Sequence, residues 1–215
     1  MAHYIEYILN EFILIKTGRI LTVNLRIEQK EQTRRKIIRA ANLLFSKQGF
    51  ARINTAAVAA KAGVSHGSIF VHFKGRDELI AAVIEEFGRS TARHMHELAE
   101  SQASLRAILA AHLGCIRHNE PFYSQLIREY SSLPHRAQME VVALQSVISH
   151  HVYLAAEIEV RAKSIKPIAP DLLFNTWIAL VNYYLANRDL FATRGSVIDE
   201  NGKKLLDHFL DLVSL

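Results

Sequence analysis

The sequence predicts an all-α protein, and three observations support this prediction. From Glu28 onward, apolar residues recur at the three- and four-residue spacing of amphipathic helices. The 215-residue chain has four prolines and nine glycines spread over its length, which excludes low-complexity and collagen-like classes. Half of its residues are hydrophobic, which is enough for a substantial core in one large domain or two joined ones.

Positive charge is concentrated in the first third of the chain. The formal net charge is +5, but residues 1–79 contain 13 Lys or Arg against 6 Asp or Glu, whereas the remainder contains 13 against 15. A basic module joined to a near-neutral one suggests a polyanionic partner such as nucleic acid, although a membrane surface would attract the same charge. The single cysteine, Cys115, excludes an intramolecular disulfide and fits a reducing compartment, so we expect a cytoplasmic location.

Residues 1–27 are largely apolar, and charged residues interrupt them. The charges stand at Glu6, Glu11, Lys16 and Arg19. No uncharged stretch therefore reaches the roughly 20 residues needed to span a bilayer. Without a basic start or a small-residue cleavage site, a signal peptide is not expected. Three interpretations stay open: a hairpin turning at Thr17-Gly18 with a second strand over residues 21–27, a helix over residues 4–15, and an upstream start absent from the native protein.

Residues 28–48 predict an amphipathic first helix. Its apolar face holds Ile37, Ala41, Leu44 and Phe45. A cationic flank near its start holds Arg34, Arg35, Lys36 and Arg39. Gly49 then suits the position just after a helix, where a left-handed backbone conformation is common.

A helix-turn-helix is predicted directly after this helix. Asn54 can cap a short second helix, because its side chain can accept a hydrogen bond from an early backbone N–H. Gly63 supplies the positive φ that a tight turn between two helices needs. Ser65 can cap a third helix that extends to about Phe73 and turns Ile69 inward.

Two runs of this region, TRRKIIRAANLLFSKQGF and NTAAVAAKAGVSHGSIFVHFKGRDELIAAVI, are informative together. They resemble the TetR family of bacterial transcriptional regulators over residues 33–84. The usual family signature has an Ile/Val-Ala pair, Ala-Gly-Val-Ser, an aromatic followed by His-Phe, and Lys-x-x-Leu. Most of it stands here, at Val58-Ala59, residues 62–65, Phe70, His72-Phe73 and residues 76–79.

The chain departs from the family pattern at four places. Phe70 stands where tyrosine is usual, so a hydroxyl that could touch a phosphate is absent. Arg76 stands where lysine is usual, which keeps the charge and offers a planar fork to phosphate. Asn54 replaces a common threonine with capping preserved. The N-terminal extension is longer than the family suggests, which leaves the native start open.

The resemblance and the residue types together predict an interface for double-stranded DNA. A helix of this size can enter the major groove with its N-terminal residues facing base edges. We expect base contacts or close approach from Ser65, His66, Gly67, Ser68, Phe70 and Val71. We expect phosphate contacts from Thr55, Lys61, His72, Lys74, Arg76 and the cationic start of the first helix. Phe73 is expected in the core.

The rest of the chain predicts a larger helical module. A fourth helix is expected to start near Asp77, and further helices over residues 104–118, 121–132, 136–162, 170–190 and 202–215. The expected domains are an extension (1–27), a helix-turn-helix DNA-binding domain (28–75) and an effector-binding and dimerisation domain (76–215). The resemblance implies that the last two long helices form a four-helix bundle between two subunits. A homodimer would then present two reading helices to a two-fold DNA site.

The resemblance also implies a pocket for a small-molecule effector among the middle helices. Such pockets use aromatic side chains and a few polar groups. The candidates are Tyr123, Tyr130, His150, Tyr153, Asn175, Trp177 and Tyr184. We therefore expect a ligand-responsive repressor, released from a palindromic operator when the effector moves the fourth helix and changes the separation of the two reading helices.

Other classes of function have less support in the sequence. No Gly-rich phosphate loop, His-Glu-x-x-His motif or nucleophile elbow occurs, so no enzyme, catalytic residue or cofactor is predicted. His112, Cys115 and His118 could share a helix face, but steps of three drift around a helix, and no metal site is predicted. The alternative hypothesis is a non-enzymatic basic protein acting at a membrane surface or on a protein partner, whereas the leading one involves no membrane.

Overall fold

The computed structural model describes residues 26–100, 103–192 and 195–215 of the chain. Within these residues the regular structure is helical, and β pairing is limited to an isolated bridge between Ile165 and Ser214. The helices are a first helix (residues 26–48), α2 (Thr55–Ala62), α3 (His66–His72), α4 (Arg76–Glu100), α5 (Leu105–His118), α6 (Glu120–Glu129), the 3-10 turn η1 (Tyr130–Ser132), α7 (His135–Arg161), α8 (Pro170–Ala186), α9 (Arg188–Phe191) and α10 (Val197–Val213).

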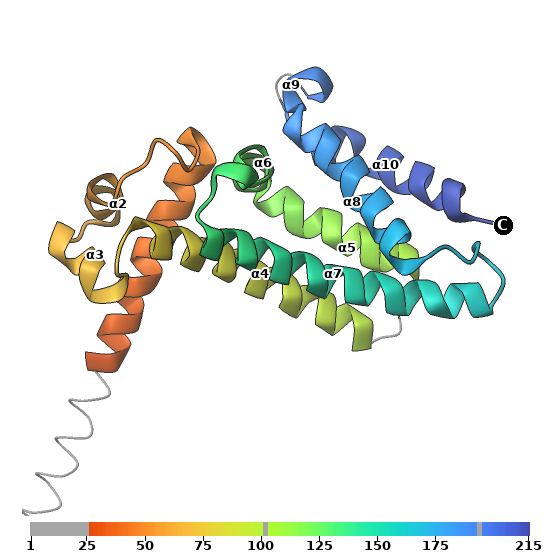
Figure 1. The fold of residues 1–215 in the computed structure, drawn as a ribbon, viewed down its shortest axis with the longest axis horizontal. Helices are drawn as coiled ribbons and strands as arrows, with labels where there is room; N and C mark the ends of the chain where they lie inside the picture. Colours follow the sequence, from red (N-terminus) through yellow and green to blue (C-terminus); the bar gives the residue numbers. More distant parts are fainter. Residues whose placement is uncertain (1–25, 101–102, 193–194) are drawn as a thin grey trace, which may run out of the picture.

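Figure 1 shows an elongated molecule with a small and a large part. The first helix, α2 and α3 lie together at one end, and we call them the helix-turn-helix unit. The long helix α4 leads from this unit into the helical body. There α4 and α7 run side by side in an extensive contact, and α5 packs on both of them. The predicted all-α fold is confirmed.

The apolar faces predicted from the sequence are buried. In the first helix Ile37, Ala41 and Phe45 are at most 1% exposed, while Leu44 is half-buried at the edge. The face expected for the fourth helix is buried in α4, at Leu79, Ile80, Val83, Ile84 and Phe87. Because these α4 residues belong to one continuous core with both parts of the molecule, α4 ties the helix-turn-helix unit to the body.

Some helix boundaries differ from the sequence predictions. The helix expected over residues 170–190 ends at Ala186, and α9 follows as a separate short helix. The last helix starts at Val197, earlier than the predicted residue 202, because the Ser196 side chain caps it by accepting a hydrogen bond from Asp199 N–H. Gly202, expected at its start, is buried within it.

One described helix, α7, is long and apolar enough to cross a membrane by length and composition alone. A core helix passes the same test, and 39% of the most apolar window of α7 is buried inside the molecule. Its inward residues include Val141, Leu144, Ile148 and Val152, which pack in the body. Burial in the core therefore accounts for the apolar character of α7.

The predictions for the N-terminal extension lie almost wholly outside the described residues. Only residues 26 and 27 are described, and both are helical. The strand predicted to end at Ile27 is therefore wrong at these two positions, where the first helix already extends.

A buried pair of rings fixes α5 against α8. His112 is 1% exposed, and its Nδ1 accepts a hydrogen bond from Trp177 Nε1–H at 3.0 Å. Trp177 in turn packs against Phe209 of α10, with ring centroids 5.2 Å apart. Burial without a second partner lowers the pKa of His112 from 6.5 to about 4.

This pKa predicts a loss of stability in acid. Below pH 6.5 the unfolded chain binds a proton at His112 that the folded protein does not bind until about pH 4. The free energy of unfolding should therefore fall by about 3 kcal/mol between pH 7 and pH 4 from this group. Urea titrations at several pH values measure it. His112→Gln, which keeps an acceptor for Trp177, should flatten the profile, and an unchanged profile would contradict the assignment.

Candidate nucleic-acid interface and effector cavities

The turn between α2 and α3 is built as the sequence predicts. Asn54 Oδ1 accepts a hydrogen bond from Ala57 N–H at 2.9 Å and caps α2. Gly63 has φ of 68°, in the left-handed region, and its N–H donates to Ala60 O while Val64 N–H donates to Ala59 O. These local hydrogen bonds end α2 within one residue and set the direction of α3.

The two faces of α3 differ sharply in exposure. Ile69 and Phe73, on the inner side, are at most 2% exposed, so the predicted core position of Phe73 is confirmed. Phe70 and Val71 are 52% and 67% exposed. Apolar side chains this exposed on a short helix are available for contact with a partner, because at least half of each stays open in the described part of the chain.

Polar groups at the start of α3 are held in place by short-range hydrogen bonds. The Ser65 side chain accepts from Ser68 N–H, and the two hydroxyls lie 2.8 Å apart. His66 Nε2 lies 2.9 Å from Thr55 Oγ1 of α2, and its ring contacts Phe70 edge-on. These groups form one exposed surface together with Gly67, where a backbone can approach closely.

The cationic flank of the first helix lies beside the end of α3. Burial, followed by the positive charges of Lys30 and Arg34, lowers the pKa of His72. The Arg34 guanidinium lies over the Phe73 ring, 5.3 Å from its centroid. The first helix therefore adds charge next to the predicted phosphate contact at His72, and neutral His72 is favoured there.

The three remaining phosphate candidates are placed differently. Lys61 and Lys74 have exposed side chains at the ends of α2 and α3. Arg76 turns back toward the turn that follows the first helix: its Nε donates to Ile53 O at 2.8 Å, and its Nη2 donates to Phe50 O. The geometry thus gives Arg76 a bracing role, and its phosphate contact stays a prediction.

Arg76→Ala should destabilise the fold by about 2 kcal/mol, because two backbone carbonyls lose a charged donor. Urea unfolding of the variant measures this loss. Lys74→Ala is the matched control, since it removes a nearby exposed cation and should change stability by under about 0.5 kcal/mol. If the Arg76→Ala protein were as stable as the parent but bound DNA more weakly, Arg76 would be a phosphate contact and would not brace the turn.

A carboxylate of the body holds the same turn from the other side. Glu129, at the end of α6, accepts hydrogen bonds from Phe50 N–H at 3.1 Å and from Ala51 N–H at 2.9 Å. The preceding Gly49 has φ of 80°, and any Cβ there would collide with the Glu129 carboxylate. The turn is therefore shaped to receive α6, and we call this contact the Glu129 joint.

Aromatic rings continue the joint into the body. Phe45 stacks on Phe50 at 4.8 Å between centroids, and Phe50 contacts Phe122 of α6 at 5.6 Å. Phe122 contacts Phe87 of α4, which contacts Tyr123 at 5.9 Å. A chain of packed rings thus connects the first helix to the inner side of α6.

Glu129→Ala should open the joint locally. The amide hydrogens of Phe50 and Ala51 lose their acceptor, so their exchange with solvent should accelerate about tenfold or more relative to the parent. Hydrogen exchange followed by NMR or mass spectrometry measures this. Glu140→Ala on α7 is the control, and equal acceleration in both variants would show a general loss of stability instead.

Two of the seven effector candidates line one cavity. A cavity of about 210 Å³ lies between α6, α7 and α8, and both Tyr123 and Tyr130 are in its wall. Tyr123 O–H donates to Asn182 Oδ1 of α8 at 3.2 Å, and burial raises the pKa of this phenol. The other lining residues are Leu126, Ile127, Val141, Leu144, Gln145 and Asn182. We call this space the α6 cavity.

The other five candidates are dispersed. His150 and Tyr153 line an open groove of about 470 Å³ between α7 and α8. Asn175 is exposed on α8, and Trp177 is fully buried in its pair with His112. Tyr184 stacks on Phe191 of α9 with centroids 3.9 Å apart. The structure therefore does not bring all seven into one pocket, and their ligand contacts stay predictions.

The histidines and the cysteine considered for a metal have other surroundings. His118 Nδ1 lies 2.7 Å from Gly114 O, and His112 pairs with Trp177. Burial raises the pKa of Cys115, which disfavours the thiolate that binds metals. No metal-binding group of His, Cys, Asp or Glu was found among the described residues.

The sequence reasoning missed Glu129, Glu120 and a groove beside α4. Each depends on residues far apart in the chain: Glu129 binds a turn 79 residues earlier, and Glu120 binds the start of α10 77 residues later. No local pattern marks such contacts. The one sequence signal for the two glutamate contacts is a glutamate at the end of a helix next to apolar residues. This pattern is too common to identify such contacts.

Comparison with known proteins gives a match for the N-terminal part. Residues 37–83 match the family model described as bacterial regulatory proteins, tetR family. A probable HTH-type transcriptional regulator, ArpR of Pseudomonas putida, is 37% identical over 90 residues, which are 42% of this chain and 40% of that protein. The match to such curated relatives thus spans less than half of their length.

Solved structures resemble most of the chain. A transcriptional regulator of the TetR family from Agrobacterium tumefaciens has a TM-score of 0.71 at 16% identity, over 86% of this chain and 100% of that one. The transcriptional regulator FadR from Bacillus subtilis, in complex with stearoyl-CoA, has a TM-score of 0.68 at 14% identity, over 81% and 96%. At these identities the likeness shows a shared fold.

Proposed function

By residues 37–83 this chain belongs to the tetR family of bacterial regulatory proteins, and we propose that it is a homodimeric transcriptional repressor. In this proposal a small-molecule effector releases it from a palindromic operator in the cytoplasm, without catalysis. Residues 28–75 form the DNA-binding domain and residues 76–215 the effector-binding and dimerisation domain.

The observation that carries the proposal is the exposed face of α3. Val71 and Phe70 stand out from a short helix whose opposite side is locked into the core by Ile69 and Phe73. This is the geometry of a helix that enters the major groove, where valine or phenylalanine can meet a thymine methyl and His66 or Ser68 can bind base edges. Lys61, Lys74 and the cationic first helix then supply phosphate contacts.

Exposed apolar residues on α8 and α10 support the homodimer. Leu172 and Tyr183 of α8 are 59% and 58% exposed, and Leu212 of α10 is 50% exposed. Such side chains on neighbouring helices favour burial against a second copy. The two helices are the last long helices of the chain, which are the pair expected to form the four-helix bundle between subunits.

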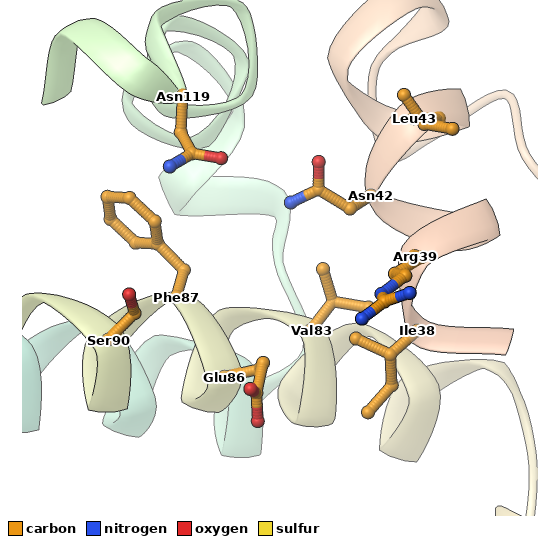
Figure 2. Close-up of a pocket in the computed structure, with 9 residues that line it drawn as sticks. All are labelled: Ile38, Arg39, Asn42, Leu43, Val83, Glu86, Phe87, Ser90 and Asn119. Atoms are coloured by element: carbon orange, nitrogen blue, oxygen red, sulfur yellow. The ribbon is translucent and has the colours of Figure 1, made fainter. Parts of the chain in front are cut away.

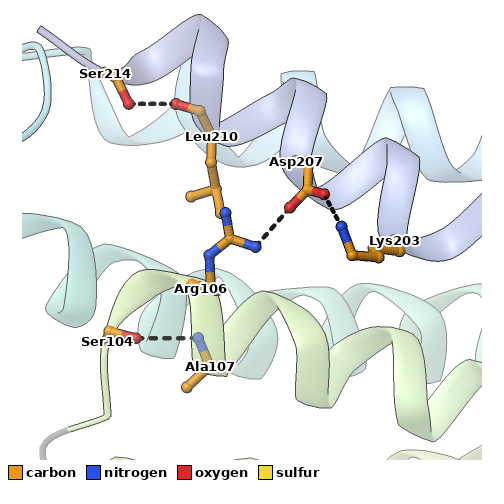
Figure 3. Close-up of polar contacts among 7 residues, drawn as sticks. All are labelled: Ser104, Arg106, Ala107, Lys203, Asp207, Leu210 and Ser214. Carbon is orange, nitrogen blue, oxygen red and sulfur yellow. Dashed lines mark hydrogen bonds and ion pairs between the residues drawn. The ribbon is translucent and has the colours of Figure 1, made fainter.

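An ion-pair network holds α10 in place for this interface (Figure 3). Arg106 of α5 donates to Asp207 of α10 at 2.6 Å, and Lys203 donates to the same carboxylate at 2.6 Å. The hydrogen bonds from Lys203 and Arg106 lower the pKa of Asp207. Exposed pairs of this kind add little stability, so their contribution here is to the orientation of α10.

We propose that the effector binds in the α6 cavity, because α6 contacts both this cavity and the turn that follows the first helix. Tyr123 of α6 and Tyr130 of η1 line the cavity, while Phe122 and Glu129 of α6 contact the turn at residues 50–51. A ligand that displaces α6 would therefore act directly on the helix-turn-helix unit through the Glu129 joint. Release from DNA then follows as a shift between two orientations of that unit.

Selection of bound sequences from a random duplex pool tests the proposal. The purified full chain at moderate salt should enrich an inverted repeat, because two α3 helices related by a two-fold axis read two half-sites. His72→Ala combined with Lys74→Ala should reduce affinity for the selected duplex without unfolding the protein. Arg161→Ala, which removes an exposed cation at the end of α7, is the control. Salt-sensitive binding with no enriched sequence would contradict the proposal.

A further inference from the structure

A groove separates the helix-turn-helix unit from the body. It is separate from the α6 cavity, and it shares only Arg39, in the cationic flank of the first helix, with the predicted DNA interface. It has a volume of about 430 Å³ and lies between the first helix and α4. That volume falls within the roughly 300–1,000 Å³ of typical small-molecule sites. Its apolar floor is built from Ile38, Val83 and Phe87, all at most 7% exposed.

The rim of the groove carries polar side chains. Figure 2 shows the amides of Asn42 and Asn119 turned toward each other across the opening, above the Phe87 ring. The Asn119 side chain makes no capping hydrogen bond, and the Asn42 amide N–H groups have no partner among the described residues. Ser90 of α4 adds a hydroxyl to the same wall. These groups can donate hydrogen bonds to a ligand.

The charges at the rim favour an anion. Arg39 lines the groove and forms no ion pair within the described part of the chain. The one carboxylate of the groove, Glu86, is paired with Arg89, whose Nη1 lies 3.5 Å from Glu86 Oε2. An uncompensated guanidinium next to amide donors and an apolar floor is suited to a carboxylate attached to an apolar body.

The space continues along α4. A second cavity of about 260 Å³ shares Phe87, Ser90 and Asn119 with the groove and extends to His94 and His118. The Phe87 ring lines both spaces. A ligand with a flat ring system can therefore pack its ring against Phe87 while the carboxylate of the ligand stays at Arg39.

We propose that this groove binds a small aromatic carboxylate, with the ring on Ile38, Val83 and Phe87 and the carboxylate on Arg39 and Asn42. The ligand would contact the first helix and α4 at once. It would therefore fix the angle between the helix-turn-helix unit and the body, a regulatory consequence that rests on the proposed function. The site is distinct from the α6 cavity, which lies between α6, α7 and α8.

Equilibrium dialysis of the full chain against 2-naphthoate tests the site, with uncharged 2-naphthamide as the paired probe. Naphthoate should bind more tightly than naphthamide. Arg39→Gln should weaken naphthoate about tenfold, which corresponds to about 1.4 kcal/mol, and leave naphthamide unchanged. Ser90→Trp places a large side chain in the space shared by both cavities, so it should weaken the binding of both probes.

Two matched variants locate the binding. Arg35→Gln removes a cation from the same helix that pairs with Glu31 outside the groove, and it should not affect naphthoate. Gln145→Trp fills the α6 cavity and should not affect it either. The groove proposal is overturned if naphthoate does not bind, if Arg35→Gln weakens it as much as Arg39→Gln, or if only Gln145→Trp abolishes it.

DNA binding of the ligand-free chain is measured on the same preparations. Intact DNA binding without naphthoate binding overturns the groove site and leaves the proposed function standing. Naphthoate binding by a chain that binds no DNA overturns the proposed function and leaves the groove site standing.

Discussion

Glu120→Ala is expected to destabilise the protein by about 2–6 kcal/mol. Glu120 is 3% exposed, and its carboxylate accepts hydrogen bonds from Ser196 Oγ–H at 2.5 Å, Val197 N–H at 2.8 Å and Ile198 N–H at 3.0 Å. Alanine would leave two buried backbone donors at the start of α10 without a partner, and each costs about 1–3 kcal/mol. Urea unfolding followed by circular dichroism measures the change.

The control is Glu157→Ala on α7, which removes a largely exposed pair with Arg161 and should cost under about 1 kcal/mol. Glu120→Gln should fall between parent and alanine variant, because an amide keeps one acceptor oxygen. An alanine variant as stable as the Glu157 control would show that water or a side-chain rearrangement satisfies the start of α10. The contact between Glu120 of α6 and the start of α10 would then stabilise the protein much less than its geometry indicates.

Val71→Glu should lower affinity for the selected duplex about a hundredfold or more while leaving the fold intact. Val71 is 67% exposed on α3, so a carboxylate is tolerated in the folded protein. In the complex with DNA, the substitution removes the apolar contact of Val71 with a base and places a carboxylate near the negatively charged phosphates. A hundredfold loss corresponds to about 2.7 kcal/mol. Fluorescence anisotropy with a labelled duplex, at one fixed salt concentration, measures it.

Val142→Glu is the matched control, since Val142 is an exposed valine, 41% exposed, on α7 and far along the chain from α3. The affinity of the Val142→Glu variant for DNA should equal that of the parent. If Val71→Glu bound the duplex as tightly as Val142→Glu, α3 would not enter the groove, and the basic first helix would have to account for any binding alone.

Local structure in the helix-turn-helix unit could be predicted from the sequence. Asn54, Gly63 and Ser65 cap or end helices through hydrogen bonds to residues at most five positions away. Interactions of this range depend on residue type and spacing. The inward faces, such as Ile69 and Phe73, followed from helical periodicity in the same way.

The role of Arg76 shows where that reasoning stops. Its position in a basic, family-like motif predicted a phosphate contact, but the fold brings Phe50 O and Ile53 O within its reach. These carbonyls precede Arg76 by 26 and 23 residues. A charged side chain binds whichever acceptor the tertiary structure presents, and the sequence does not encode that choice locally.

The sequence by itself determined the helical class, the helix-turn-helix with the exposed face of its second helix, and the resemblance to a regulator family, because these depend on periodicity and on contacts within a few residues. Only the tertiary structure decided the Glu129 joint, the cap of α10 by Glu120, the α6 cavity and the groove at Arg39. Each of these arises where helices distant in sequence pack together, and their relative placement depends on the whole core.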